Sequence, residues 1–264
     1  MRFHYFKNPI KNIKNDSGFI SIFRSIGFIG DSLSSGEHES FINGVKGYHD
    51  YFEYSWGQYI ARKYGLVAYN FSIGGLSAIK FFDYIAHNNP FDNNRVCQAY
   101  MIALGVNDLN HLNEYYIDGF GSINDINFDN EDLNKKSFIG QYVRIIQKLR
   151  RFEPKCRIFL ITIPKEKTES SIQRKQRDEM RKILLKLPML FEFIYVIDLR
   201  KYAPIYNNSF MRKYYLGGHM NAIGYKFTAD MIAKYVDYII KHNIDDFRQV
   251  GFIGKNFYNQ TEKW

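Results

Sequence analysis

Cysteine, tryptophan and proline are scarce in this chain, and long apolar runs are missing. Its 264 residues include 2 cysteines, 2 tryptophans and 6 prolines. Cys97 and Cys156 lie far apart without the spacing of a zinc site, so we interpret them as buried thiols and not as a disulfide framework. No apolar run approaches the roughly 20 residues of a membrane-spanning helix. The sequence therefore predicts neither a disulfide scaffold nor a transmembrane segment.

A secretory signal is not evident either. Met1 to Gly18 is basic and polar and has no apolar core of the kind that a signal peptide carries. Together with the two thiols, this segment predicts a reducing, cytoplasmic location.

Acidic residues are fewer than basic residues in this chain, and the difference is concentrated in one segment. The chain has a net charge of +9, and residues 144–186 hold 14 basic against 5 acidic side chains. A pair of solvated helices explains this segment best, and a contact with an anionic surface or substrate is the alternative. Its aromatic residues are only Phe152 and Phe159, so base stacking has little support and we expect no nucleic-acid partner.

Short apolar runs alternate with helical patterns along most of the chain. The candidate strands are Ile22–Ile29, Val67–Phe71, Ala99–Leu104, Arg157–Ile163 and Phe193–Asp198. Strands that alternate with helices indicate βαβ units around a mostly parallel sheet, the α/β class. The last helical pattern begins after Asn221, which is a suitable N-cap.

The composition fits one compact unit. Hydrophobic residues make up 45% of the chain, which is enough for a core. We expect a single domain over residues 1–264, with its core at about 21–242, an N-terminal extension at 1–20 and a C-terminal tail at 243–264.

A serine follows the first candidate strand at a position suited to catalysis. The run ends in Gly30-Asp31-Ser32-Leu33, and α/β proteins place their ligands at the carboxyl edge of the sheet. The free N–H groups of a helix that begins there favour developing negative charge. Ser32 is therefore a candidate nucleophile, with helix capping as the alternative.

Three further segments follow in order. Gly75 lies in a glycine pair after the second strand, where the backbone can expose its N–H to a ligand. Asn107 follows the third strand, and its carboxamide can donate a hydrogen bond to an oxyanion. His219 follows Gly217-Gly218 and can act as the general base for Ser32. Each segment alone could be a turn or a helix start, but turn chemistry does not readily explain the four together.

With these four segments the sequence resembles the SGNH, or GDSL, hydrolase family, named for its Ser, Gly, Asn and His. The resemblance covers about residues 25–230 and assigns these roles to Ser32, Gly75, Asn107 and His219. It implies a flavodoxin-like three-layer sandwich with a five-stranded, mostly parallel central sheet. It also implies an oxyanion hole formed by the N–H groups of Ser32 and Gly75 and the side chain of Asn107.

The expected activity is that of a serine esterase for small acyl esters, with acetyl as the expected acyl group. Ser32 attacks the ester carbonyl, and His219 takes its proton and returns it to the leaving alcohol. The expected partner is a small-molecule ester, with acylated carbohydrates among the candidates, and no cofactor or metal is implied. A carbohydrate O-acetyltransferase and a non-catalytic binding module on the same fold remain the alternatives.

One position departs from the family pattern. An aspartate usually stands three residues before the histidine, and here that position is Leu216. The group that orients His219 is therefore open: the backbone carbonyl of Leu216 is favoured, and Asp118 and Asp198 are the candidate carboxylates. The expected walls of the site are residues 34–54 and 114–134. The acids and histidines of the first segment show no metal-ligand spacing.

Overall fold

The centre of the protein is a parallel sheet of five strands. The structure, a computed structural model, describes residues 18–85 and 88–255. The strands lie in the order β4-β1-β5-β6-β7, all parallel. Their bounds are β1 Ser25–Gly30, β4 Val67–Ser72, β5 Ala99–Ala103, β6 Arg157–Ile161 and β7 Ile194–Ile197. This confirms the predicted α/β class and all five candidate strands.

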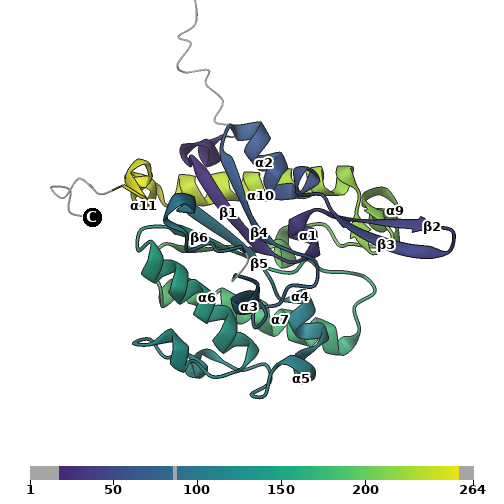
Figure 1. Ribbon diagram of the computed structural model, residues 1–264, viewed down its shortest axis with the longest axis horizontal. Helices are drawn as coiled ribbons and strands as arrows, with labels where there is room; N and C mark the ends of the chain where they lie inside the picture. Colours follow the sequence, from purple (N-terminus) through teal and green to yellow (C-terminus); the bar gives the residue numbers. More distant parts are fainter. Residues whose placement is uncertain (1–17, 86–87, 256–264) are drawn as a thin grey trace, which may run out of the picture.

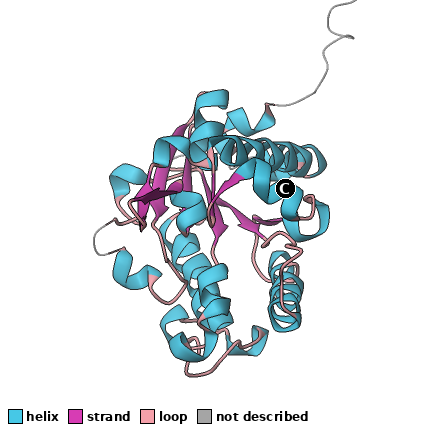
Figure 2. Ribbon diagram, turned by 90° about the vertical axis from the view of Figure 1, so that its right-hand side faces the viewer, coloured by secondary structure: helices cyan, strands magenta, loops and turns pink. Residues whose placement is uncertain are grey.

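Helices cover both faces of this sheet, which makes three layers (Figures 1 and 2). On one face lie α2 Trp56–Tyr64 and α10 Ala222–His242, and on the other lie α6 Phe138–Phe152 and α7 Ser171–Leu184. Shorter helices join them: α1 Ser32–Ser35, α3 Phe81–Tyr84, α4 Val106–Asn110, α5 Leu112–Tyr115, α8 Leu199–Tyr202, α9 Asn208–Tyr214 and α11 Ile244–Phe247.

The strand sequences explain why both faces are covered. Phe28 of β1 packs among the side chains of α2 and α10, whereas its neighbour Ile29 packs on the opposite face with α6 and α7. Successive side chains of a strand point to opposite faces, so a continuous apolar run needs a hydrophobic layer on each side. The long helices are capped as their sequences indicate: Asn221 accepts a hydrogen bond from the Gly224 N–H at 2.9 Å, which confirms the predicted start of α10.

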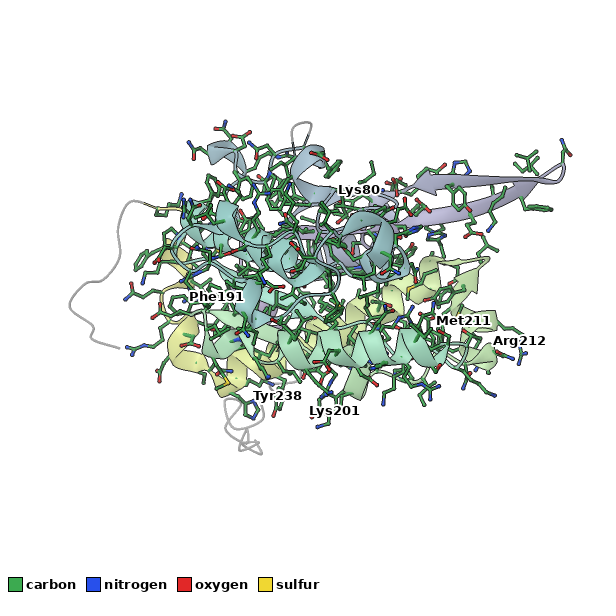
Figure 3. The ribbon with its side chains drawn as sticks, turned by 90° about the horizontal axis from the view of Figure 1, so that it is seen from below. Lys80, Phe191, Lys201, Met211, Arg212 and Tyr238 are labelled. Atoms are coloured by element: carbon green, nitrogen blue, oxygen red, sulfur yellow. The ribbon has the colours of Figure 1, made fainter. Side chains whose placement is uncertain are left out.

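A β-hairpin between α1 and α2 was not predicted. It consists of β2 Glu37–Ile42 and β3 Val45–Asp50, joined by Asn43 and Gly44 with φ angles of 53° and 79°. Positive φ at both residues is the signature of the tight hairpin turn that Asn-Gly favours. The hairpin projects from the body of the protein, beyond the end of α9 where Met211 and Arg212 lie (Figures 1 and 3).

Both described ends of the chain belong to the core. The N–H groups of Gly18 and Ile20 bind the carboxylate of Asp237 on α10, at 2.7 and 3.0 Å. After α10 the chain turns back, and Phe247, Val250 and Ile253 are buried in the same layer. The predicted core boundary at residue 242 is therefore too early. The remainder of the predicted extension and tail, residues 1–17 and 256–264, lies outside the described residues.

The basic segment at 144–186 is extensively paired with acids. Arg144 and Lys148 bind Asp132, Arg177 binds Glu169, and Arg181 binds Asp198. Part of its excess charge is thus used in ion pairs within the fold. Among the residues that the structure describes, no helix is long and apolar enough to cross a membrane.

The C-terminal segment allows a direct test of the corrected boundary. Phe247 is 6% exposed and packs between Phe23, Phe159 and Tyr195, so Phe247→Ala should lower the free energy of unfolding by about 3–5 kcal/mol. Ile244, three residues earlier, is 59% exposed, so Ile244→Ala should change the free energy of unfolding by less than about 0.5 kcal/mol. Urea denaturation measures both, and equal effects would show that residues 243–255 are not part of the core.

Candidate active site

Three of the four predicted site residues lie just beyond the ends of adjacent strands. In the sheet, Gly30 at the end of β1 is level with Ser72 of β4 on one side and Ala103 of β5 on the other. Parallel strands that end in register bring the segments that follow them to one edge. Ser32, Gly75 and Asn107 therefore share the carboxyl edge of the sheet, at the point where the strand order reverses.

Ser32 is the first residue of α1, and Asp31 caps that helix by accepting a hydrogen bond from the Leu33 N–H at 3.1 Å. Neither the hydroxyl nor the N–H of Ser32 bonds to another residue in the described part of the chain. The same holds for the N–H of Gly75, which has a φ of 73°. That angle is open to glycine and strained for other residues, so the backbone conformation itself requires Gly75.

Asn107 is held from the other side of the turn. Its amide nitrogen donates a hydrogen bond to the Leu76 carbonyl at 3.0 Å. A carboxamide nitrogen carries two hydrogens, so one fixes the side chain and the second is free to donate to a ligand. Gly75 and Asn107 are thus coupled through Leu76, the residue next to Gly75.

Asp108, the next residue, ties this turn to the interior. Its carboxylate accepts hydrogen bonds from the Ala78 N–H at 2.7 Å and from the Tyr116 hydroxyl. Burial raises the pKa of Asp108 to about 6, even though these hydrogen bonds act in the opposite direction. Of the loop at 114–134, Tyr116 is the residue that supports the site. Asp125 and Glu131 of that loop bind Ser137 and Lys148, at the start and in the middle of α6.

His219 lies between two carboxylates of the hairpin. It belongs to β9 His219–Met220, which pairs with β8 Tyr215–Leu216 and packs against α1 and β2. Its Nδ1 is 2.7 Å from Glu39 Oε1, and its Nε2 is 3.0 Å from Glu37 Oε1. Both ring nitrogens therefore have a carboxylate partner, and neither partner was among the predicted candidates.

The predicted orienting groups are placed elsewhere. Asp198 binds Arg181 through both of its carboxylate oxygens, at 2.7 and 2.9 Å, and Asp118 accepts a hydrogen bond from the Lys136 N–H. The Leu216 carbonyl was the favoured partner for His219, but Nδ1 faces Glu39 instead. The expectation for all three groups is wrong for this reason: an acid 180 residues away in sequence takes the place of the missing aspartate.

Two glycines make room for that acid. Glu39 Oε1 also accepts the Gly218 N–H at 2.9 Å, and Oε2 binds Lys46 Nζ at 2.7 Å. A Cβ on Gly217 or Gly218 would collide with the Glu39 carboxylate. Burial alone would raise the pKa of Glu39, but the hydrogen bonds from Lys46, Gly218 and His219 outweigh it and lower the pKa to about 2. Glu39 is thus a permanent anion beside His219.

The sequence did contain a signal for this arrangement. Asn43-Gly44 stands between two segments rich in β-forming residues, which is a strong hairpin pattern. With the hairpin recognised, Glu37 and Glu39 fall on the same face of one strand, because their side chains are two residues apart. Which acid reaches which histidine still depends on packing between distant segments.

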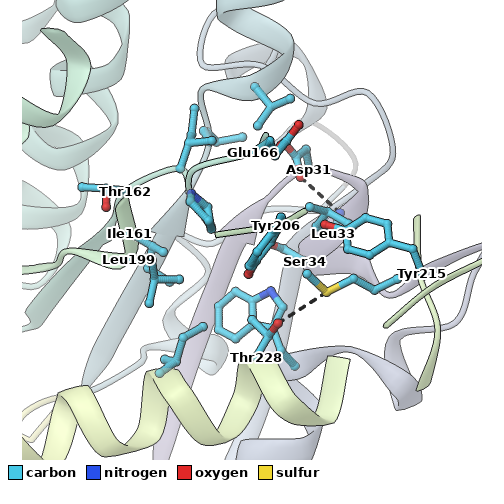
Figure 4. Close-up of a pocket in the computed structure, with 18 residues that line it drawn as sticks. Asp31, Leu33, Ser34, Ile161, Thr162, Glu166, Leu199, Tyr206, Tyr215 and Thr228 are labelled. Carbon is cyan, nitrogen blue, oxygen red and sulfur yellow. Dashed lines mark hydrogen bonds between the residues drawn. The ribbon is translucent and has the colours of Figure 1, made fainter. Parts of the chain in front are cut away.

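A cavity of about 80 Å³ lies beside α1, lined by residues that include members of α1, α2, β5, β6 and α10 (Figure 4). Most of its wall is apolar, but the Ser34 hydroxyl is buried in it and has no hydrogen-bond partner among the described residues. Asp31 also lines it, and burial raises the pKa of Asp31 to about 7. In the described part of the chain, no group of three or more His, Cys, Asp or Glu is arranged to hold a metal ion.

The fold and the residues at the sheet edge are those of a serine hydrolase of the α/β class. A sequence profile of the GDSL-like lipase/acylhydrolase family matches residues 28–227, most of the chain. The protein therefore belongs to this family of carboxylic ester hydrolases. No curated protein sequence matches it significantly.

Solved structures of esterases share the fold at low sequence identity. A family two carbohydrate esterase from Clostridium thermocellum, in complex with cellohexaose, superposes with a TM-score of 0.57 at 17% identity, over 84% of this chain and 65% of that one. This chain thus spans less than two thirds of that esterase. A family two carbohydrate esterase from Cellvibrio japonicus gives 0.54 at 14% identity, over 83% and 62%. A G-D-S-L family protein from Desulfitobacterium hafniense DCB-2 gives 0.51 at 12%, over 80% and 99%.

The buried Asp31 predicts a specific pH dependence of stability. Its pKa rises from 3.8 to about 7 on folding, so the neutral form is favoured in the fold. The neutral Asp31 side chain therefore adds to the free energy of unfolding, and this stabilisation is fully present below pH 3.8. It falls by up to about 1.4 kcal/mol per pH unit as the pH rises to about 7. Asp31→Asn should therefore gain stability relative to the parent as the pH rises from 4 to 7, as measured by denaturant titration. Asp118→Asn, at an exposed aspartate, is the control, and a pH-independent effect of Asp31→Asn would contradict the assignment.

Proposed function

We propose that the protein is a serine esterase that removes short acyl groups, acetyl above all, from hydroxylated substrates such as carbohydrates. The observation that carries this proposal is the hydrogen bond of 2.7 Å between His219 Nδ1 and Glu39 Oε1, on a strand that packs against α1, the helix that begins with Ser32. A histidine whose Nδ1–H is held by a fixed carboxylate presents Nε2 in the tautomer that accepts a proton.

The reaction has two halves. In the first, Ser32 Oγ attacks the ester carbonyl carbon while its proton moves to His219 Nε2, and the resulting intermediate expels the alcohol, which takes that proton. In the second, His219 removes a proton from water, the hydroxide attacks the acyl-serine, and the carboxylic acid leaves as Ser32 recovers its proton. Glu39 stays ionised throughout and stabilises the imidazolium that forms in each half.

The oxyanion of each intermediate has three donors. These are the N–H groups of Ser32 and Gly75 and the second amide hydrogen of Asn107, none of which is used by a described residue. Donors that are fixed before the reaction stabilise developing charge without reorganisation. Removal of one such donor typically costs about 2.7–4 kcal/mol of transition-state free energy.

The hairpin supports a hydroxyl-rich substrate. The Tyr48 ring lies edge-on to His219 with ring centroids 5.9 Å apart, and Tyr48 is 57% exposed. An exposed tyrosine offers an apolar face for a sugar ring and a hydroxyl for hydrogen bonding. The carbohydrate esterases among the structural neighbours are consistent with such a substrate.

Replacing the residues of the proposed mechanism one at a time should lower kcat to different degrees. Ser32→Ala and His219→Ala should each lower kcat on an acetyl ester by more than about 10³-fold, and Glu39→Gln should lower it by about 10²- to 10⁴-fold by disturbing the tautomer of His219. Asp118→Asn should leave it unchanged. A fluorophosphonate probe should label Ser32 in the parent protein. Full activity of Glu39→Gln in a folded protein would remove Glu39 from the mechanism.

The acyl group can be tested separately. Neither candidate wall of the site carries a long apolar stripe, so kcat/KM should be higher for an acetyl ester than for a long-chain ester of the same alcohol. Rates on p-nitrophenyl acetate and p-nitrophenyl decanoate measure this directly. An equal or higher value on the decanoate would overturn the preference for short acyl groups, while leaving the serine mechanism intact.

A further inference from the structure

Two carboxylates flank one imidazole, and their surroundings differ sharply. Glu39 is fixed by three donors, from Lys46, Gly218 and His219. Among the described residues, the Glu37 carboxylate has one charged partner, His219 Nε2, in an ion pair at 3.0 Å. Burial raises the pKa of Glu37, His219 lowers it, and the nearby acids Asp50 and Glu39 raise it further, whereas His49 lowers it. Glu39 therefore has a permanent structural role, and Glu37 can exchange its partner.

Glu37 also occupies space that a substrate needs. Its Oε1 faces the ring nitrogen that must accept the proton of Ser32, at 3.0 Å. Its Oε2 lies over the Gly74–Gly75 turn, where a Cβ on Gly74 would collide with it. The backbone of Glu37 is fixed, because its carbonyl accepts a buried hydrogen bond of 2.6 Å from the Tyr225 hydroxyl. The carboxylate can therefore move only by side-chain rotation about an anchored residue.

This contact blocks the base in the unliganded site. The Nε2 atom faces the Glu37 carboxylate at 3.0 Å, and when it carries a proton it has no lone pair for Ser32. The base becomes available when the Glu37 carboxyl turns away and keeps that proton, which leaves a neutral imidazole held by Glu39. A buried carboxyl needs a new polar partner when it gives up the old one, because an unpaired polar group is costly away from water.

We propose that Glu37 is a specificity-determining residue that binds a hydroxyl group next to the ester in the alcohol part of the substrate, and that this contact draws it away from His219. The inference rests on the proposed esterase function and names its substrate class: esters of polyols, such as partly acylated sugars. A carboxyl group both donates and accepts hydrogen bonds, and a hydroxyl is its complement. An ester without a neighbouring hydroxyl leaves Glu37 on His219 and reacts slowly.

Two probes that differ by one hydroxyl test this pairing. They are cyclohexyl acetate and trans-2-hydroxycyclohexyl acetate, compared by kcat/KM. The parent protein should prefer the hydroxylated ester by about 5- to 100-fold, because the other ester gives the displaced carboxyl no hydrogen-bond partner. Glu37→Ala should abolish this preference, chiefly by raising the rate on cyclohexyl acetate, and should speed the labelling of Ser32 by a fluorophosphonate. Glu37→Gln, which keeps the shape of the side chain, should reduce the preference at least several-fold.

The controls separate this inference from the proposed function. Glu192→Ala removes an acid whose side chain is 78% exposed and lies outside both candidate walls, and it should keep the parent preference. If the parent hydrolyses both esters, Ser32→Ala is inactive and both Glu37 variants keep the parent preference, the role of Glu37 is wrong and the esterase stands. If neither ester is hydrolysed and Ser32 is not labelled in any variant, the esterase is wrong and the inference fails with it.

Discussion

The hydrogen bond between Glu39 and His219 joins segments that lie 180 residues apart, and the geometry of the site depends on it. It sets the orientation of the imidazole, and it holds β2 against β9. A second long-range bond, from the Tyr225 hydroxyl to the Glu37 carbonyl, fixes the base of the same hairpin to α10. The absence of an aspartate at Leu216 and the presence of glycine at 217 and 218 are thus related. A carboxylate that arrives from another segment needs backbone donors and open space, and Gly217 and Gly218 supply both.

The sheet supplies the other half of the site. Because β1 lies between β4 and β5, the turns after these three strands meet at one edge. Each turn contributes one residue to the site. A strained or tightly constrained position at each turn keeps that group in place: the left-handed Gly75, the Leu76 contact of Asn107 and the Asp31 cap before Ser32. The two hydrophobic layers that cover the faces of the sheet hold these positions in place.

Much of this architecture could be predicted from the sequence, since it depends on local signals. Short apolar runs located all five strands, and Asn221 located the start of α10. The hairpin was not predicted although Asn43-Gly44 signals it, because its two strands are mostly polar and lack the apolar pattern of a buried strand. The partner of His219 could not be predicted from the sequence for a different reason. Asp118 and Asp198 were plausible by residue type, and only tertiary packing decides that Asp198 meets Arg181 while Glu39 meets His219.

The charge balance around His219 explains why a hairpin can carry two acids into one site. Two carboxylates close together repel each other, so each is stabilised by a nearby cation or hydrogen-bond donor. Lys46, on the strand opposite Glu39, binds the Glu39 oxygen that His219 does not use, so the hairpin brings both the acid and its neutralising cation. Glu37 has no such cation and is the one carboxylate here whose charge is not compensated by lysine or arginine among the described residues. The two acids share a strand and a face, and their different partners give one a fixed role and leave the other free to respond to a ligand.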